Sequence, residues 1–154
     1  MNTSLADELS PLWRNFSLNW NSRDFAALRA LWHPEVAPVY FAEEIDRPLL
    51  DWPAIESYWH DVRRSFIALD TQIMDLRSLP RGENQAASLF VMRWQALMSN
   101  NQAPIAGDTR VIANLARHGN DWKITQYVEA PLAPIVYMRK LYQRIAENQL
   151  WVSR

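Results

Sequence analysis

The chain has 154 residues, which is the length of one domain, since single cores typically contain roughly 100–200 residues. Sixteen lysines and arginines against seventeen aspartates and glutamates give a net charge of −1, so an extended nucleic-acid interface is not expected. The absence of cysteine excludes disulfide scaffolds, thiolate zinc sites and thiol nucleophiles. Three glycines leave almost no room for a glycine-rich phosphate-binding loop.

Neither a targeting segment nor a membrane span is expected from the sequence. The stretch from Met1 to Leu12 carries Asp7 and Glu8 and lacks a basic segment followed by an apolar run, so it does not resemble a signal peptide. No apolar stretch approaches the ~20 residues that cross a bilayer. These observations predict a cytoplasmic protein with no membrane partner.

The amino-terminal third predicts two helices. Apolar side chains recur there every three or four residues and share one helical stripe; they are Leu5, Leu9, Leu12, Trp13, Phe16 and Trp20. The stretch from Asn21 to Asp24 interrupts this pattern, and Asp24 is a suitable N-cap for a second helix from Phe25 to Trp32. His33 precedes Pro34, and a residue before proline is pushed out of the α region, which ends the second helix.

A short strand and a third helix are predicted next. Val36 to Phe41 has strand character, and Pro38 favours an edge position because it cannot donate a ladder hydrogen bond. The sequence Asp51-Trp52-Pro53 is a helix-start signal, with proline tolerated in the first turn. The apolar stripe of this third helix consists of Ile55, Tyr58, Trp59, Val62 and Phe66.

The second half changes to strand-length runs separated by short turns, which predicts an antiparallel meander. The four runs are Leu69 to Leu79, Ala86 to Ser99, Arg110 to Arg117 and Trp122 to Ala130. A final helix is predicted from about Pro134 to Leu150, so that residues 133–150 extend a single domain of 154 residues. Helices followed by strands are typical of α+β folds in which helices cover one face of a curved sheet. A ligand is then expected at the open end.

Three segments resemble the nuclear transport factor 2-like superfamily. Members of that superfamily often have a helix, an Asn-x-x-Asp break and a short helix that ends in Leu-(Phe/Trp)-His-Pro. The matching residues here are Asn21, Asp24, Leu31, Trp32, His33 and Pro34. Pro48-Leu49 followed by Ala54-Ile55 and Tyr58-Trp59 is similar to a second motif of the family, with Asp51 near its usual glycine, and Gly119 to Glu129 resembles its closing strand.

The resemblance implies an α+β cone, a curved antiparallel sheet wrapped around the amino-terminal helices, and often a homodimer formed through the sheet. Relatives include ketosteroid isomerase, scytalone dehydratase, limonene-epoxide hydrolase and SnoaL-like polyketide cyclases, and other relatives are non-catalytic transport or assembly domains. The three signature positions of ketosteroid isomerase fall here on Phe16, Tyr40 and Ala113 or Asn114. Because all three depart from that enzyme, its mechanism is not expected.

The histidines offer little for catalysis or metal binding. His118 lies in a predicted turn, His60 lies beside the apolar stripe of its helix, and His33 ends the second helix. No two of them are spaced as zinc or iron ligands, so neither a metal nor another cofactor is expected. His33 with Glu35 is only a weak signal.

The polar groups of the cavity are expected on the strands. Successive strand residues point to opposite faces, and either face of the last strand can line the cavity from its pattern alone. The candidates for catalysis are Glu129, Tyr127 and Tyr40, and those for ligand binding are Phe16, Trp20, Trp59, Trp94, Arg93, Asn114 and Gln126. An ion pair between Arg93 and Glu129, with Trp94 in the core, is the competing interpretation. The loop acids Glu43, Glu44 and Asp46 are expected to be solvated, unless one of them is desolvated and acts as a base.

Two functions remain open from the sequence. The first is a SnoaL-like enzyme that acts on a small hydrophobic or aromatic molecule by cofactor-free proton transfer, in an isomerisation, dehydration, cyclisation or epoxide opening. The second is a non-catalytic ligand-binding or dimeric assembly module. A cavity carboxylate with a raised pKa favours the enzyme, and an exposed carboxylate paired with arginine favours the module.

Overall fold

The computed structural model describes residues 4–133 and 135–148. Three helices and a short strand come first: α1 (Leu5–Ser22), α2 (Phe25–Ala30), β1 (Val39–Phe41) and α3 (Trp52–Ser65). Four long strands and a helix follow: β2 (Phe66–Pro80), β3 (Gln85–Met98), β4 (Ile105–His118), β5 (Asp121–Pro131) and α4 (Ile135–Asn148). The expected α+β order is confirmed.

Side-chain caps decide where the helices begin. Ser4, Asp24 and Asp51 each accept a hydrogen bond from the backbone N–H three residues later, at the starts of α1, α2 and α3. The predicted end of α2 was wrong by two residues. Trp32 leaves the helix because it forms a bridge with Ile124 of β5, and tertiary pairing there outweighs helix propensity.

The sheet is mixed rather than wholly antiparallel. Its strand order is β1-β5-β4-β3-β2. The predicted meander from β2 to β5 is confirmed, but β1 pairs with β5 in parallel. β1 is an edge strand, as Pro38 indicated, and it starts only at Val39, after this proline.

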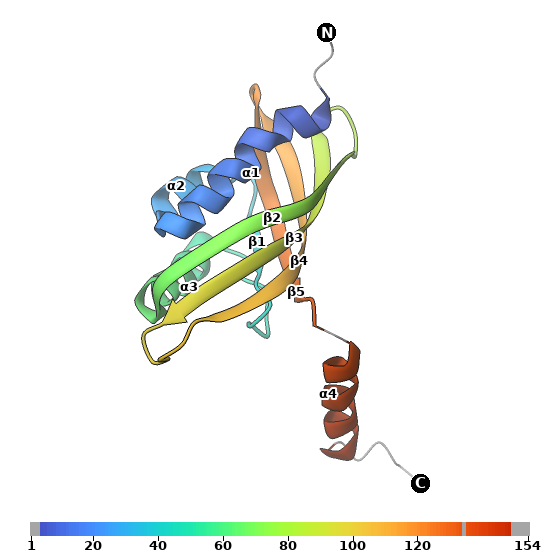
Figure 1. The fold of residues 1–154 in the computed structure, drawn as a ribbon. Coiled ribbons are helices and arrows are strands. Elements are labelled where there is room, and N and C mark those ends of the chain that lie inside the picture. Colours follow the sequence, from blue (N-terminus) through green and yellow to red (C-terminus); the bar gives the residue numbers. More distant parts are fainter. Residues whose placement is uncertain (1–3, 134, 149–154) are drawn as a thin grey trace.

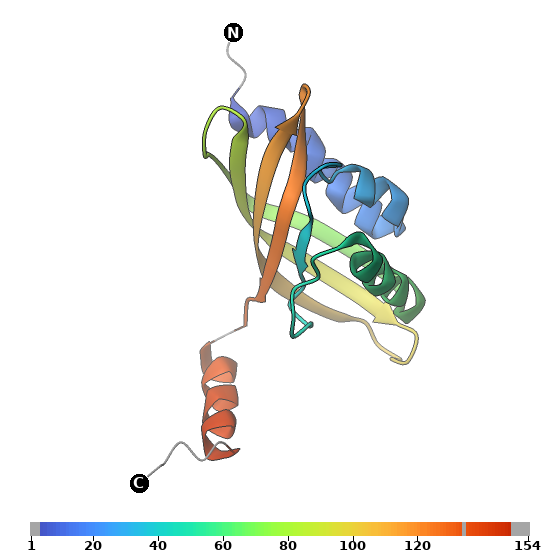
Figure 2. The same cartoon turned by 180° about the vertical axis from the view of Figure 1, so that it is seen from behind.

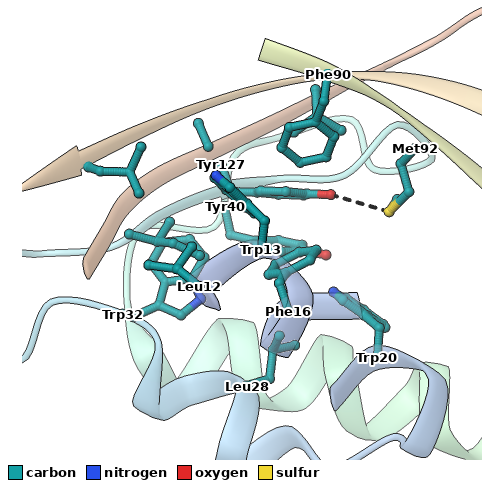
Figure 3. Packing of buried hydrophobic residues seen from close by; sticks show 14 of the residues in the cluster. Leu12, Trp13, Phe16, Trp20, Leu28, Trp32, Tyr40, Phe90, Met92 and Tyr127 are labelled. Atoms are coloured by element: carbon teal, nitrogen blue, oxygen red, sulfur yellow. Dashed lines mark hydrogen bonds between the residues drawn. The ribbon is translucent and has the colours of Figure 1, made fainter. Parts of the chain in front are cut away.

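The core lies between the sheet and the three amino-terminal helices, which all cover one face of the curved sheet (Figures 1 and 2). Aromatic rings fill its centre (Figure 3). Tyr40 and Tyr127 stack with ring centroids 5.4 Å apart, and Phe16 lies 5.1 Å from Tyr127. The indole N–H of the buried Trp13 donates to Ser88 on β3 at 3.0 Å, so α1 is fixed to the sheet by polar contact as well as packing.

α4 extends away from the rest of the molecule at the end opposite the amino terminus (Figures 1 and 2). Its described apolar side chains are largely exposed; they include Val136, Tyr137, Leu141 and Tyr142. Pro134, Gln149 and Leu150 of the predicted helix lie outside the described residues. Within the described part of the chain, no helix has the length and apolar character that a membrane crossing requires.

Candidate functional site

A cavity of about 270 Å³ lies between the helices and the concave face of the sheet. Every element from α1 to β5 except α2 contributes to its wall. The apolar and aromatic lining residues are Trp20, Tyr40, Tyr58, Val62, Phe66, Leu69, Met92, Trp94, Met98 and Ile105. The remaining lining residues are Thr71, Thr109, Glu43, Glu44 and Glu129. An apolar hollow with a few convergent polar groups is the usual form of a small-molecule site.

A β-bulge in β5 brings Glu129 to the cavity. Leu115 of β4 pairs with Ile124, whereas Asn114 pairs with Gln126, so Thr125 is an extra residue in β5. An extra residue reverses the alternation of side chains beyond it. Trp122 and Ile124 therefore point inward before the bulge, and Tyr127 and Glu129 point inward after it.

The surroundings of Glu129 favour its neutral form. The pKa of Glu129 is raised to about 7, mainly by burial and also by the nearby Glu44 and Glu43 carboxylates, against the hydrogen-bonding influence of Tyr127 and of the Glu43 backbone. The Glu43 N–H donates to Glu129 Oε2 at 3.2 Å. Near neutral pH, this carboxyl group therefore exists in both protonation states and can accept or donate a proton.

Glu43 lies at the end of a hydrogen-bonded chain across the cavity wall. Trp94 Nε1 donates to Thr109 Oγ1 at 3.1 Å, and the Thr109 hydroxyl donates to Glu43 Oε2 at 2.7 Å. Burial raises the pKa of Glu43, although the Thr109 hydroxyl opposes this. The indole of Trp94 packs on Gly107, where a Cβ atom would lie 2.8 Å from a ring carbon.

Two tyrosines complete the polar part of the cavity. The Tyr58 hydroxyl on α3 donates to the carboxylate of the exposed Glu44. Tyr40 on β1 is buried in the cavity wall. Burial raises the pKa of both phenols, and a neighbouring group raises it further, Tyr58 in the case of Tyr40 and Glu44 in the case of Tyr58. Both hydroxyls thus stay protonated and act as hydrogen-bond donors.

The structure brings four of the ten predicted site residues to this cavity: Glu129, Tyr40, Trp20 and Trp94. Three others are core residues behind the wall: Tyr127, Phe16 and Trp59. The Tyr127 hydroxyl points to the sulfur of Met92, at 3.8 Å (Figure 3). Tyr127 therefore supports the wall from behind.

The expectation that Arg93, Asn114 and Gln126 supply polar groups to the cavity was wrong, because all three lie on the convex face of the sheet. Arg93 pairs with Asp108 at 2.9 Å rather than with Glu129. Asn114 donates to Gln126 at 2.7 Å. Strand alternation places Arg93 and Trp94 on opposite faces, so the sequence already implies that the two do not both line the cavity. The face of Gln126 depends on the bulge.

Tyr58 and Thr109 are cavity residues that sequence reasoning did not select. The sequence pattern places Tyr58 in an apolar stripe. Thr109 precedes the predicted strand, which starts at Arg110, whereas β4 in the structure starts at Ile105 and includes Thr109. Glu43 and Glu44 were expected to be solvated, but only Glu44 is exposed. Their proximity to Glu129 follows from the parallel pairing of β1 with β5.

A family profile described as a SnoaL-like domain matches residues 12–134. The chain belongs to the SnoaL-like domain family. The match ends just before α4. The SnoaL-like chain has no significant match among the curated proteins.

Solved structures show the same fold at low sequence identity. A nuclear transport factor 2-like superfamily protein from Salmonella enterica is 14% identical, with a TM-score of 0.73 over 82% of this chain and 90% of that chain. A ketosteroid isomerase-like protein from Erwinia carotovora is 11% identical, with a TM-score of 0.72 over 87% and 100%. The hexachlorocyclohexane dehydrochlorinase LinA-type3 from Novosphingobium barchaimii is 11% identical, with a TM-score of 0.68 over 82% and 88%. At these identities the likeness concerns the fold, and function has to be argued from the cavity.

Proposed function

We propose that this SnoaL-like protein is a cofactor-independent lyase, isomerase, cyclase or hydrolase that moves a proton on a small hydrophobic molecule. The observation that carries the proposal is Glu129, a carboxyl group in an apolar cavity with a pKa of about 7. A general base or acid works best when its pKa lies near the operating pH. Perturbed carboxyl groups in cavities are also more frequent at functional sites than elsewhere.

A non-catalytic assembly module is expected to pair Glu129 with an arginine. Among the described residues, Glu129 forms no ion pair. The ion pairs there join Arg29 to Glu56, Arg93 to Asp108, and Arg117 to Glu8. Because Glu129 is not held in such a pair, its proton is available to a ligand. This supports the enzyme over the non-catalytic module.

In the proposed reaction, Glu129 removes a proton from a carbon atom next to an electron-withdrawing group, and the Tyr40 hydroxyl donates a hydrogen bond to the oxygen that gains charge. The raised pKa of Tyr40 keeps this hydroxyl protonated. Tyr127, stacked on Tyr40 at 5.4 Å, positions the donor. Return of the proton to another carbon is an isomerisation, and loss of a leaving group is an elimination. One structural neighbour is named for an elimination, the dehydrochlorinase.

The test is proton exchange, which requires no knowledge of the final product. A panel of cyclic and aryl ketones is incubated with the protein in deuterated water, and deuterium uptake at the α-carbon is followed by NMR. Glu129→Gln keeps the shape of the side chain but cannot accept a proton. It should slow exchange by roughly 10²–10⁴-fold, the usual contribution of a general base.

Glu56→Gln serves as the matched control, because Glu56 is an exposed carboxylate on α3 that pairs with Arg29 and does not line the cavity. It should change the exchange rate by less than about tenfold, since a solvated carboxylate is not poised for proton transfer. Equal exchange by the wild type and Glu129→Gln over the whole panel would refute the proposed role of Glu129.

We further propose that two copies associate through the convex face of the sheet. Leu89, Ile112 and Val128 are aligned across β3, β4 and β5, and 52% of the surface of Ile112 is exposed. Among the described residues no helix covers this face (Figure 2). A contiguous apolar row on an open sheet face is typical of a protein–protein interface. The homodimer would leave the concave cavity free.

A further inference from the structure

The cavity is strongly one-sided in charge. Among the 15 residues that line it, three are glutamates, and none is lysine, arginine or histidine. Glu43 and Glu129 share the backbone contact at 3.2 Å, and Glu44 is the next residue along the chain. Like charges this close repel one another, most strongly where water is excluded. An anionic ligand is therefore strongly disfavoured in this cavity.

The described part of the chain does not neutralise these carboxylates. Its three ion pairs all lie elsewhere. Hydrogen bonds reach the carboxylates from the Thr109 hydroxyl, the Tyr58 hydroxyl and the Glu43 backbone. These donors are uncharged, so repulsion among the carboxylates is left for protons or a bound cation to relieve.

The remaining walls suit an organic cation. Five of the lining residues are aromatic: Trp20, Tyr40, Tyr58, Phe66 and Trp94. Aromatic faces attract cations electrostatically and also bury the apolar part of a ligand. Within the described residues, no three histidine or acidic side chains are grouped so as to hold a metal ion, which favours an organic cation over a metal.

A second and independent feature of the wall also points to a ligand. Trp20 is only 6% exposed, and its indole N–H has no hydrogen-bond partner. Four buried side-chain atoms among the described residues lack a partner, and only Trp20 Nε1 belongs to a cavity-lining residue. A buried donor without a partner costs free energy until an acceptor reaches it.

We propose that the ligand of this cavity is a hydrophobic ammonium compound that carries a hydrogen-bond acceptor, with the ammonium group beside Glu43, Glu44 and Glu129 and the acceptor at the Trp20 N–H. This inference rests on the proposed function, because it names the substrate class of the same cavity. The ammonium group offsets the repulsion among the carboxylates and favours the ionised form of Glu129, which is the form that accepts a proton.

The experiment compares three probes of one shape by isothermal titration calorimetry. They are 6-methoxy-2-naphthylmethylamine, the corresponding alcohol and 6-methoxy-2-naphthoate, which are cationic, neutral and anionic at pH 7.5. The amine should bind at least tenfold more tightly than the alcohol, and the carboxylate should bind more weakly than either. Equal or tighter binding of the alcohol or carboxylate, or no binding of the amine, would overturn the proposal.

Two variants separate charge from shape. Glu43→Gln should weaken binding of the amine several-fold and leave binding of the alcohol unchanged. Glu56→Gln is the matched control, because Glu56 lies on α3 outside the cavity and pairs with Arg29; it should change neither. Trp20→Phe should weaken binding of the methoxy amine and not that of unsubstituted 2-naphthylmethylamine. Equal losses for the two amines would contradict the acceptor at Trp20.

The pH dependence gives a third readout. Glu129 faces Glu43 and Glu44 from the loop after β1, Tyr40 of β1, Tyr58 of α3 and Tyr127 of β5. Below about pH 7 the amine must displace the proton of Glu129, so its affinity should rise from pH 5.5 to 8, and Glu129→Gln should flatten this rise. Affinity that is flat or falls over this range in the wild type would contradict the proposal. If the protein does not prefer the amine but its proton exchange still depends on Glu129, the proposed ligand class is wrong and the proposed role of Glu129 as a base remains.

Discussion

Glu129 shows how one side chain acquires its chemistry from its neighbours. The residue is an ordinary glutamate at the end of a strand, and nothing in its local sequence marks it as unusual. Burial beside two further carboxylates raises its pKa from the usual 4.5 to about 7. Burial of the ionised carboxylate lowers the stability of the folded state. The size of this effect depends on pH because the group is ionised only above its pKa.

Stability should therefore fall as pH rises across the titration of Glu129. The folded pKa lies above the unfolded pKa, so the folded protein binds more protons between pH 4.5 and about 7 and loses stability over that window as the proton leaves. Glu129→Gln has no such penalty. It should be more stable than the wild type at pH 8, by up to about 3 kcal/mol, and similar to it at pH 4.5. Urea unfolding at both pH values measures the difference in the free energy of unfolding between the variant and the wild type. A difference that is the same at pH 4.5 and pH 8 would contradict the prediction.

Gly107 is a second residue whose role is set by a neighbour. A Cβ atom there would lie 2.8 Å from a ring carbon of Trp94, so Gly107→Ala should displace the indole and weaken the 3.1 Å bond from Trp94 to Thr109. We expect a loss of about 1–3 kcal/mol in the free energy of unfolding. The same change in a Trp94→Phe background should cost less, since the smaller ring leaves space. Equal costs in both backgrounds would show that the contact is unimportant.

At the scale of elements, α1 is joined to β2 through one amide side chain. Asn21 Oδ1 accepts from the Thr71 N–H at 2.7 Å and from the Thr71 hydroxyl at 2.8 Å. Asn21 Nδ2 donates to the Thr71 carbonyl and to Asp70. Thr71 lines the cavity, so this contact also places the end of α1 against the site.

Asn21→Ala should lower the free energy of unfolding by about 2–3 kcal/mol, because it leaves the buried Thr71 groups without partners. Asn15→Ala on the exposed side of α1 is the control, and its effect should stay within about 0.5 kcal/mol. Chemical denaturation measures both. A loss no larger than that of Asn15→Ala would mean that water replaces the Asn21 amide.

At the scale of the whole molecule, the two faces of the sheet differ in what they carry. The concave face and its helices enclose the cavity, and the convex face carries the row formed by Leu89, Ile112 and Val128. A charge in the middle of that row should oppose association. Ile112→Glu is expected to yield a monomer in sedimentation velocity, whereas Leu18→Glu, on the exposed side of α1, should leave the wild-type state unchanged. A dimer that persists in Ile112→Glu would place the interface elsewhere.

Most of the elements follow from local rules and were predicted correctly. Asp24 and Asp51 cap α2 and α3, and the turns that end each apolar run delimit β2 to β5. Capping and periodicity involve neighbours in the chain, so they can be recognised without a structure. The end of α2 at Ala30 and the parallel direction of β1 could not be predicted, because both depend on pairing with β5.

The amino-acid sequence by itself thus determines that this chain forms an aromatic-rich α+β domain. It also provides Glu129, Tyr40, Trp20 and Trp94 as side chains that can line a cavity. Folding in three dimensions decides which groups reach it. The extra residue Thr125 is defined only by the register between β4 and β5, and it turns Glu129 inward while Gln126 faces outward. The meeting of Glu129 with Glu43 likewise needs β1 beside β5. Contacts between distant segments set both register and burial, and burial is the main cause of the raised pKa of this carboxyl group.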